Sequence, residues 1–293
     1  MVENEIRMMA ESKEEEMGLR INTNVPALSA QRAVGITNKE LSSTLGKLST
    51  GSRINKSADD AAGLAISEKL KAQLRGNRQA NRNAGDGISL IQTAEGGLNE
   101  ISSMLTRLRE LSIQAATDTV GDPERGFTNM EYQNLKQEIQ RIAQVTEFNG
   151  KKLLNGEGDK YDFQIGLNND QFEDRIAFDA QVSNATLDSL SMSELDVATK
   201  EGAQNSLGVL DAAISKVSGE RAFLGATQNR LSSTMNNLDV MHENMSEANS
   251  RIRDTDYAEE TSKNVRLNIR NNAGASVLSQ ANQMGSVALK LLG

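Results

Sequence analysis

The sequence contains no cysteine and no tryptophan, and only two of its 293 residues are proline. The absence of cysteine excludes disulfides, thiolate zinc ligands and a cysteine nucleophile. Aromatic residues make up 3% of the chain, so the large side chains that usually fill a globular core are scarce. Pro26 and Pro123 leave about a hundred residues between them without a strong helix breaker. Long helices that pack on one another are therefore expected.

Two further absences bear on location and partners. The sequence has no run of about eighteen apolar residues, and its glutamate-rich N-terminus lacks the apolar core of a signal peptide. If the protein leaves the cell, we expect export without a cleaved signal, and we expect no membrane insertion. The net charge of −8 argues against nucleic acid as a partner. The single histidine, His242, excludes a zinc site with two histidines.

Apolar residues recur at helical spacing over most of the chain. Steps of three and four, as in a coiled-coil seam, run through 91–115 and again through 207–252. Shorter stretches with the same period lie at 25–48 and 135–145. We expect the two long seams to pack inside one chain.

Five segments interrupt this period. YDFQIG (161–166) and RIAFDA (175–180) alternate apolar and polar residues, which predicts a small β-hairpin. VGDPERGF (120–127) is expected to end a helix. STGSRINKSADDAAG (49–63) and RDTDYAEET (253–261) are polar and are expected to be irregular. The predicted fold class is mainly α, a long antiparallel helical coiled-coil bundle with one small β-hairpin.

The two ends of the chain share an unusual composition. Residues 17–38 and 261–293 contain no acidic side chain and few basic ones. A helix that is polar only through Asn, Gln and Ser can be surrounded by protein. We therefore expect the terminal helices to pair and to be buried against copies of the same chain.

Several long motifs resemble those of bacterial flagellins, in that family's order. The resemblance covers the chain from Met17 to Gly293. It implies a structural subunit that polymerises into the helical filament of the flagellum for swimming motility, with no catalytic, cofactor or metal site. The motifs are GLRINTNVPALSAQR (18–32), LSTGSRINKSADDAAGLAISEKL (48–70), LTRLRELSIQAA (105–116), EIQRIAQVTEFNGKKLLNG (138–156) and ANQMGSVALKLLG (281–293).

The resemblance also implies an inner domain, D0, built from the terminal helices, and an outer rod-like domain, D1, built from the middle helices and the hairpin. Little sequence is left for further outer domains. The expected boundaries are a polar leader at 1–16, an N-terminal D0 helix at 17–50, a spoke at 51–63, a first part of D1 with two helices and the hairpin at 64–200, a D1 C-terminal helix at 201–253 and a D0 C-terminal helix at 254–293.

The leader is a departure from the flagellin pattern. Flagellins typically begin close to the position of Gly18, so Met17 is a candidate start and residues 1–16 a misassigned segment. A genuine disordered leader is the alternative interpretation.

The terminal helices carry the predicted self-assembly surface. Two helices alone bury too little apolar area to be stable, so neighbours in an assembly are expected to order them. The residues expected to make these contacts are Val34, Leu41, Leu45, Val277, Leu278, Ala281, Met284, Ala288, Leu291 and Leu292.

A second candidate surface lies in and near LTRLRELSIQ. Arg107, Arg109, Leu111 and Glu131 fall where the resemblance implies a patch that the flagellin-sensing Toll-like receptor of animals contacts. Contact between neighbouring D1 domains is the interpretation we favour, with receptor recognition as a secondary use of the same surface.

Two pairs of aspartates could suggest a calcium site. Asp59–Asp60 and Asp254–Asp256 lack the ligand spacing of an EF-hand. We expect these carboxylates to accept hydrogen bonds from nearby backbone.

The resemblance to flagellins also implies binding partners and a location for the protein. The main partner is a second copy of the chain in a homopolymer. The others are the flagellar type III export apparatus, a flagellin chaperone and the filament cap, and the location is the extracellular filament. Two other structural classes remain as alternatives, a hook–filament junction protein and a coiled-coil secretion-system effector or tip protein.

Overall fold

The computed structural model describes residues 23–290, so the expected leader at 1–16 lies outside the described residues. The chain forms two compact units. The first joins the N-terminal residues up to Glu68 with the C-terminal residues from Asn249, and the second is Lys69–Ala248. None of the described helices is long and apolar enough to cross a membrane.

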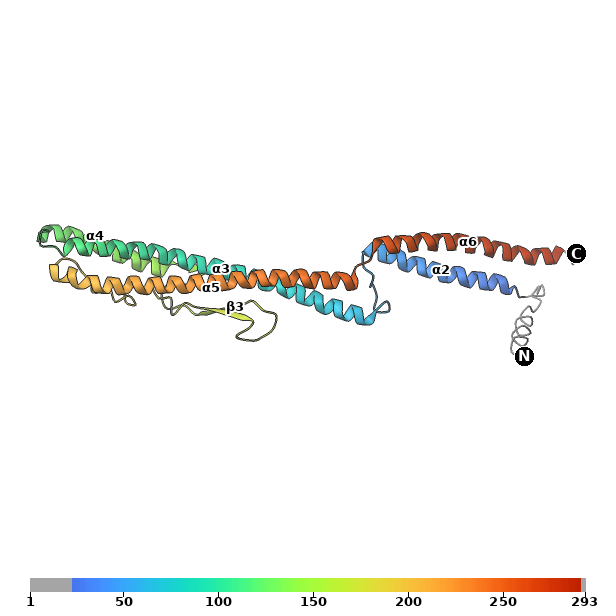
Figure 1. Ribbon diagram of the computed structural model, residues 1–293, viewed down its shortest axis with the longest axis horizontal. Helices are drawn as coiled ribbons and strands as arrows, with labels where there is room; N and C mark the ends of the chain where they lie inside the picture. Colours follow the sequence, from blue (N-terminus) through green and yellow to red (C-terminus); the bar gives the residue numbers. More distant parts are fainter. Residues whose placement is uncertain (1–22, 291–293) are drawn as a thin grey trace, which may run out of the picture. The chain divides into compact units, whose positions relative to one another are not determined.

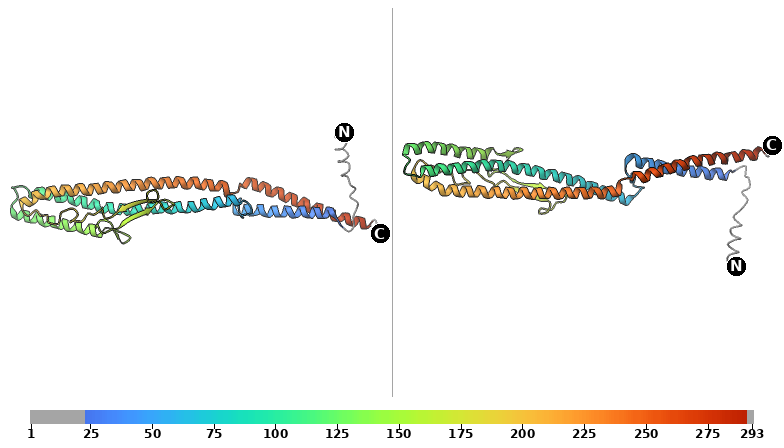
Figure 2. Two further views of the ribbon diagram at one scale, coloured as in Figure 1. Left: turned by 90° about the horizontal axis from the view of Figure 1, so that it is seen from below. Right: turned by 45° about the horizontal axis from the view of Figure 1, so that its top comes forward.

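The first unit is a pair of long helices, α2 (Val25–Thr50) and α6 (Tyr257–Lys290). They run side by side in opposite directions, as Figures 1 and 2 show. Asn24 caps α2 by accepting the amide of Ala27 (3.1 Å) and donates to the carbonyl of Ala281 on α6 (2.8 Å). The side chain that starts one helix thus also fixes the end of the pair.

The two expected irregular segments meet inside the first unit. The amide of Arg53 donates to the carbonyl of Arg253 (2.6 Å), and the amide of Thr255 donates to the carbonyl of Gly51 (2.9 Å). The backbone turns at Gly51 with φ of 68°, a left-handed conformation that glycine adopts without strain. Segments about two hundred residues apart in the sequence therefore form one joint.

The second unit contains α4 (Asp122–Val145) and most of α3 (Ala61–Ala115) and α5 (Lys200–Arg253). α5 lies along α3, since Ser206 donates to Ser112 (2.9 Å) at one end of the contact and Asn77 donates to the Leu238 carbonyl (2.7 Å) at the other. Their inner faces hold aliphatic side chains that repeat every three or four residues, which confirms the predicted long helices and helical bundle.

Two small antiparallel hairpins cover this bundle. β1 (Glu147–Phe148) pairs with β2 (Lys151–Lys152) through an Asn149–Gly150 turn, in which both residues have positive φ. β3 (Lys160–Gln164) pairs with β4 (Arg175–Asp179), which confirms the predicted hairpin. On its inner face Tyr161 stacks on Phe178, with ring centroids 6.2 Å apart.

Three helix boundaries differ from the sequence expectation, one of them at Tyr257, where α6 begins inside the polar segment 253–261. α3 ends at Ala115, before the segment 120–127, and Pro123 lies in the first turn of α4, where a missing amide proton costs nothing. α3 also begins inside the polar segment 49–63, because the Asp60 carboxylate accepts the amide of Gly63 (2.8 Å) and caps the helix.

Candidate self-assembly surface

The contact face of α2 is small and partly polar. Its buried residues Ala30, Thr37 and Thr44 are seven apart, as one position of a heptad repeat. Each threonine takes the place of the aliphatic residue that a coiled coil normally has there. The hydroxyl of Thr37 donates to the Ala33 carbonyl of its own helix (3.0 Å), so its proton is not used in a hydrogen bond to α6.

The facing side of α6 has the same character. Along this side of α6 follow Asn264, Leu267, Asn271 and Gly274. Among the described residues of α6, Leu267 is the one large apolar residue whose side chain is buried. A Cβ at Gly274 would lie 2.8 Å from Cγ2 of Val34, so this glycine allows the two helices to approach closely. The contact between α2 and α6 therefore buries little apolar area for its length.

Larger apolar side chains lie on the opposite faces of the two helices. On α2 they are Val25, Leu28 and Ile36, and on α6 they are Val265 and Ile269. Each is between 51% and 64% exposed. At 100° per residue, all five lie well away from the contact face of their own helix. We call these five residues the outer apolar stripe; its α2 part and its α6 part lie on opposite sides of the helix pair.

The predicted self-assembly residues divide between the two faces. Ala281 is buried in the contact of α2 with α6, whereas Leu45 and Val277 are half-exposed. Sequence reasoning missed the outer apolar stripe, although a helical wheel of 25–36 would have found its α2 part. Three further predicted residues, Val34, Leu41 and Leu278, are partly buried on the contact side. The side chains of Met284 and Ala288 lie outside the described part of the structure, and so do all atoms of Leu291 and Leu292.

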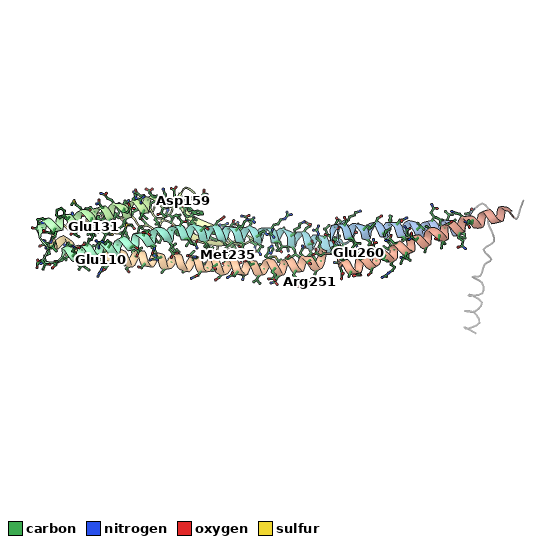
Figure 3. The ribbon with its side chains drawn as sticks, turned by 90° about the horizontal axis from the view of Figure 1, so that it is seen from above. Glu110, Glu131, Asp159, Met235, Arg251 and Glu260 are labelled. Carbon is green, nitrogen blue, oxygen red and sulfur yellow. The ribbon has the colours of Figure 1, made fainter. Side chains whose placement is uncertain are left out.

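The second predicted patch is a pair of ionic contacts on the surface of the second unit. Arg107 donates to Glu131 of α4 (2.9 and 3.0 Å) and to Glu110 of its own helix (3.0 Å), near the end of the bundle where Figure 3 labels both acids. Arg109 donates to Asp211 of α5 (2.6 Å). These hydrogen bonds to carboxylates raise the pKa of both guanidinium groups. The patch thus joins all three helices.

Leu111 does not belong to this surface. It is 2% exposed and packs in the apolar core of the second unit. The three-residue steps that place Leu105, Leu108 and Leu111 on one face carry its side chain inward. A folded subunit therefore cannot offer Leu111 to a partner.

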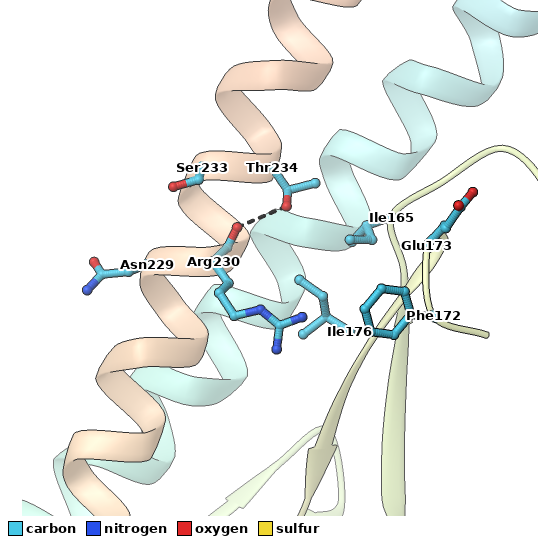
Figure 4. A pocket seen from close by; sticks show the side chains of 8 residues that line it. All are labelled: Ile165, Phe172, Glu173, Ile176, Asn229, Arg230, Ser233 and Thr234. Atoms are coloured by element: carbon cyan, nitrogen blue, oxygen red, sulfur yellow. Dashed lines mark hydrogen bonds between the residues drawn. The ribbon is translucent and has the colours of Figure 1, made fainter. Parts of the chain in front are cut away.

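An open groove lies between the larger hairpin and α5 (Figure 4). Ile165 and Ile176 form its apolar floor, and Arg230 of α5 borders it. Phe172, in the loop that joins the two strands, lines one edge and is 90% exposed. A fully exposed phenylalanine beside an apolar floor is a feature that a partner can cover.

Three of the four aspartates expected to accept backbone hydrogen bonds do so, namely Asp59, Asp60 and Asp256. Asp59 accepts the amides of Asn55 (3.1 Å) and Lys56 (2.9 Å), which lowers the pKa of its carboxyl. Asp256 accepts the amides of Ala258 and Glu259 at the start of α6. Within residues 23–290, no group of three potential metal-ligating side chains comes together.

Comparison with known proteins follows the same division of the chain. Residues 21–159 match the bacterial flagellin N-terminal helical region, and residues 207–292 match the bacterial flagellin C-terminal helical region. The chain is 43% identical to a flagellin of Halalkalibacterium halodurans over 272 residues, which cover 93% of this chain and 99% of that one. It is 41% identical to the flagellin of Bacillus subtilis over 304 aligned positions, which cover 94% and 100%.

A likeness in fold also extends to a solved structure. A putative flagellar hook-associated protein from Vibrio parahaemolyticus matches with a TM-score of 0.55 and 14% identity, over 67% of this chain and all of that one. At this identity the match shows a shared fold alone.

Proposed function

The chain belongs to the bacterial flagellin family, and on that premise we propose that copies of it assemble through the outer apolar stripe of α2 and α6. As a flagellin it is a structural subunit that polymerises into the flagellar filament, and it is not an enzyme. The proposal concerns which surface makes the polymer.

The proposal rests on where the apolar side chains of the first unit lie: small and polar residues occupy the contact between its helices, and larger apolar residues face outward. Thr37, Thr44 and Gly274 occupy the contact between the helices, while Val265 and Ile269 face outward. Two helices with so small a buried contact are marginal in water, because apolar burial provides most of the stability of a helix in a protein. Neighbouring copies that cover the stripe would supply the missing burial.

The test compares two double variants. Val265→Ser with Ile269→Ser removes the α6 part of the stripe, and Val240→Ser with Met241→Ser makes the same kind of change at exposed positions of α5. The first variant is expected to raise the critical concentration for filament growth about 30-fold, since each lost burial costs about 1 kcal/mol. The second is expected to leave it within about threefold of the unmodified protein.

Filament growth from sheared seeds, followed by light scattering and electron microscopy, measures this concentration. Circular dichroism of the monomers checks that both variants keep their helices. Normal growth of the Val265→Ser, Ile269→Ser variant would contradict the proposal.

We propose the two compact units as D0 and D1. D0 would contain α2 and α6, and D1 would contain the three-helix bundle with its hairpins, which agrees with the division into units.

Before assembly, the outer apolar stripe is exposed to water and needs a partner that covers it. A chaperone in the cell, an export apparatus that passes the unfolded chain without a cleaved signal, and a filament cap at the growing end are the proposed further partners. The proposed location is outside the cell.

We propose the patch of Arg107, Arg109 and Glu131 as a contact between D1 domains, with an animal Toll-like receptor as a secondary partner. The ion pairs are exposed and accessible. Arg107→Glu tests both roles, because it should weaken filament growth and, separately, activation of receptor-bearing reporter cells. Unchanged growth would remove the first role and unchanged activation the second.

A hook–filament junction protein is the nearest alternative. The shared fold with a hook-associated protein does not separate the two roles. The identity of over 40% with flagellins along nearly the whole chain favours the filament subunit.

A further inference from the structure

Charge is segregated along the chain of the second unit. Residues 156–199, which we call the acidic segment, hold ten acidic and two basic side chains. Their net charge of −8 equals that of the whole protein. Residues 69–85 hold five basic side chains and no acidic one. One unit therefore carries two stretches of opposite sign.

The basic stretch presents one face of α3 to solvent. Arg75, Arg78 and Arg82 follow one another at steps of three and four, and all three side chains are exposed. Between them, Asn77 is buried against α5, and Asn83 donates to a backbone carbonyl of β3 (2.9 Å). Helical geometry places the three arginines outside the buried contacts with these neighbours, with Arg78 at the edge of the contact with α5, beside His242. We call them the arginine face.

No ion pair joins the arginine face to an acidic residue of its own subunit, so far as the described residues extend, although Asp239 of α5 lines the same surface pocket as Arg78 and Arg82. The Arg82 guanidinium donates to the side-chain oxygen of Gln79, and that of Arg78 lies 3.4 Å from Nε2 of His242. No ion pair of these three arginines occurs among residues 23–290. Three other exposed arginines of the unit, Arg107, Arg109 and Arg141, do have carboxylate partners, whereas the exposed Arg230 of α5 has no ion pair among the described residues.

The acidic segment likewise keeps exposed carboxylates without a cation. Asp159, Asp162 and Glu173 are exposed and have no ion pair among the described residues. Asp162 alternates along β3 with Tyr161 and Phe163, which face the core, so its carboxylate points to solvent. In Figure 4 the Glu173 side chain points away from Arg230 of α5.

We propose that the arginine face of one copy docks on the acidic segment of a neighbouring copy. The inference rests on the proposed assembly and names a second contact within it. Each copy offers one surface of each sign, so the contact joins unlike surfaces and continues from copy to copy, as a filament requires. A free polyanion is a poorer occupant, because the acidic segment in the same unit repels it.

The test uses reversed charges on either side of the contact. Variant R carries Arg75→Glu, Arg78→Glu and Arg82→Glu, and variant A carries Asp159→Lys, Asp162→Lys and Glu173→Lys. Each alone is expected to raise the critical concentration for seeded growth at least tenfold at low salt, about the value of three weak ion pairs. An equimolar mixture of the two is expected to grow at close to the normal concentration, because each then meets an oppositely charged neighbour.

The remaining outcomes decide against the proposal. Normal growth of either variant alone overturns it, and so does failure of the mixture to recover when both variants are folded by circular dichroism. The effect must also shrink in 1 M salt, where the screening length is about 3 Å. If variant R grows normally while the Val265→Ser, Ile269→Ser variant does not, the docking contact fails and the proposed function stands. If both grow normally, both proposals fail.

Discussion

The two units place different side chains between their helices. The core of the second unit is a continuous series of buried aliphatic residues along α3 and α5, closed by α4 and the hairpins. The contact between α2 and α6 has threonine, asparagine and glycine at corresponding positions, and its larger apolar side chains face outward. The second unit thus buries its apolar side chains within one chain, whereas the first unit leaves many of its own exposed, where other chains can bury them.

This difference separates stability from assembly. Substitutions in the second unit should change the unfolding of the monomer, and substitutions in the first should change filament growth more than unfolding. The same chemical change, made once in each unit, tests this separation most directly.

Leu108→Ala and Leu267→Ala form that matched pair, since both leucines are buried. Leu108→Ala removes a fully buried side chain from a closed core and should lower the free energy of unfolding by about 3 kcal/mol. Leu267→Ala should lower the main unfolding midpoint of the monomer far less, because the α2–α6 contact adds little to it. Urea unfolding followed by circular dichroism measures both.

Seeded growth supplies the complementary measurement. We expect Leu267→Ala to raise the critical concentration, and any folded Leu108→Ala subunit to grow almost normally. Equal effects of the two variants on the unfolding midpoint would show that the units are not different in this way.

The second unit contains one buried guanidinium, and its loss is the next largest expected effect. Arg125 is 7% exposed, and it donates to the carbonyl of Ala115 (3.0 Å), the last residue of α3, and to that of Thr117 (2.8 Å) just beyond it. Arg125→Met would leave two carbonyls without donors and should cost about 2 kcal/mol in unfolding experiments. Arg141→Met removes an exposed arginine paired with Glu138 and should cost less than about 0.5 kcal/mol. A similar cost for both would show that burial at Arg125 is unimportant.

Most of the secondary structure of the second unit was predictable from sequence, because the spacing of its apolar residues is regular. The three- and four-residue steps of 91–115 give a helix with one apolar face, and the alternation around Tyr161 and Phe178 gives a hairpin. The helix boundaries near Pro123 and Asp60 were less accurate, because one residue can act as a breaker or as a first-turn residue depending on its neighbours.

The candidate surfaces were less predictable, since exposure depends on packing between distant segments. Leu111 lies in a motif that suggests a surface, yet its side chain is buried in the core of the second unit. The pairing of Arg53 with Arg253 joins segments that carry no shared local pattern. The terminal helices could be recognised as a pair from their missing acids, but which of their apolar residues face outward required the structure.

Glu220 gives the second unit a pH dependence opposite in sign to that expected from Asp59 of the first unit, whose carboxyl has a lowered pKa. Burial raises the pKa of the Glu220 carboxyl to about 7, against a smaller opposing effect of Lys216, and its Oε2 has no hydrogen-bond donor among the described residues. Between pH 4.5 and about 7 the folded state keeps a proton that the unfolded chain releases, so stability falls as the pH rises through this window. Glu220→Gln does not titrate and should be more stable than the unmodified protein at pH 8 by about 1 kcal/mol, allowing for partial exposure.

Unfolding midpoints at pH 5 and pH 8 measure this difference. Glu138→Gln is the control, since its pairing with Arg141 lowers the pKa of the Glu138 carboxyl and reverses the sign of the dependence. A Glu220→Gln variant with the same pH profile as the unmodified protein would exclude Glu220 as the titrating group.

The smallest expected effect concerns a polar site inside the aliphatic core. The hydroxyl of Tyr132 is buried close to the hydroxyls of Ser112 and Ser206, which bond to each other (2.9 Å), but it makes no hydrogen bond of normal geometry among the described residues. Removing an unpaired buried hydroxyl relieves its desolvation cost, so Tyr132→Phe should be neutral or stabilising by up to about 1 kcal/mol. Ser206→Ala breaks the serine–serine bond instead and should cost about 1 kcal/mol. If Tyr132→Phe were the more costly change, the hydroxyl would have to be bonded in solution, and the core of the second unit would depend on polar contacts as the α2–α6 pair does.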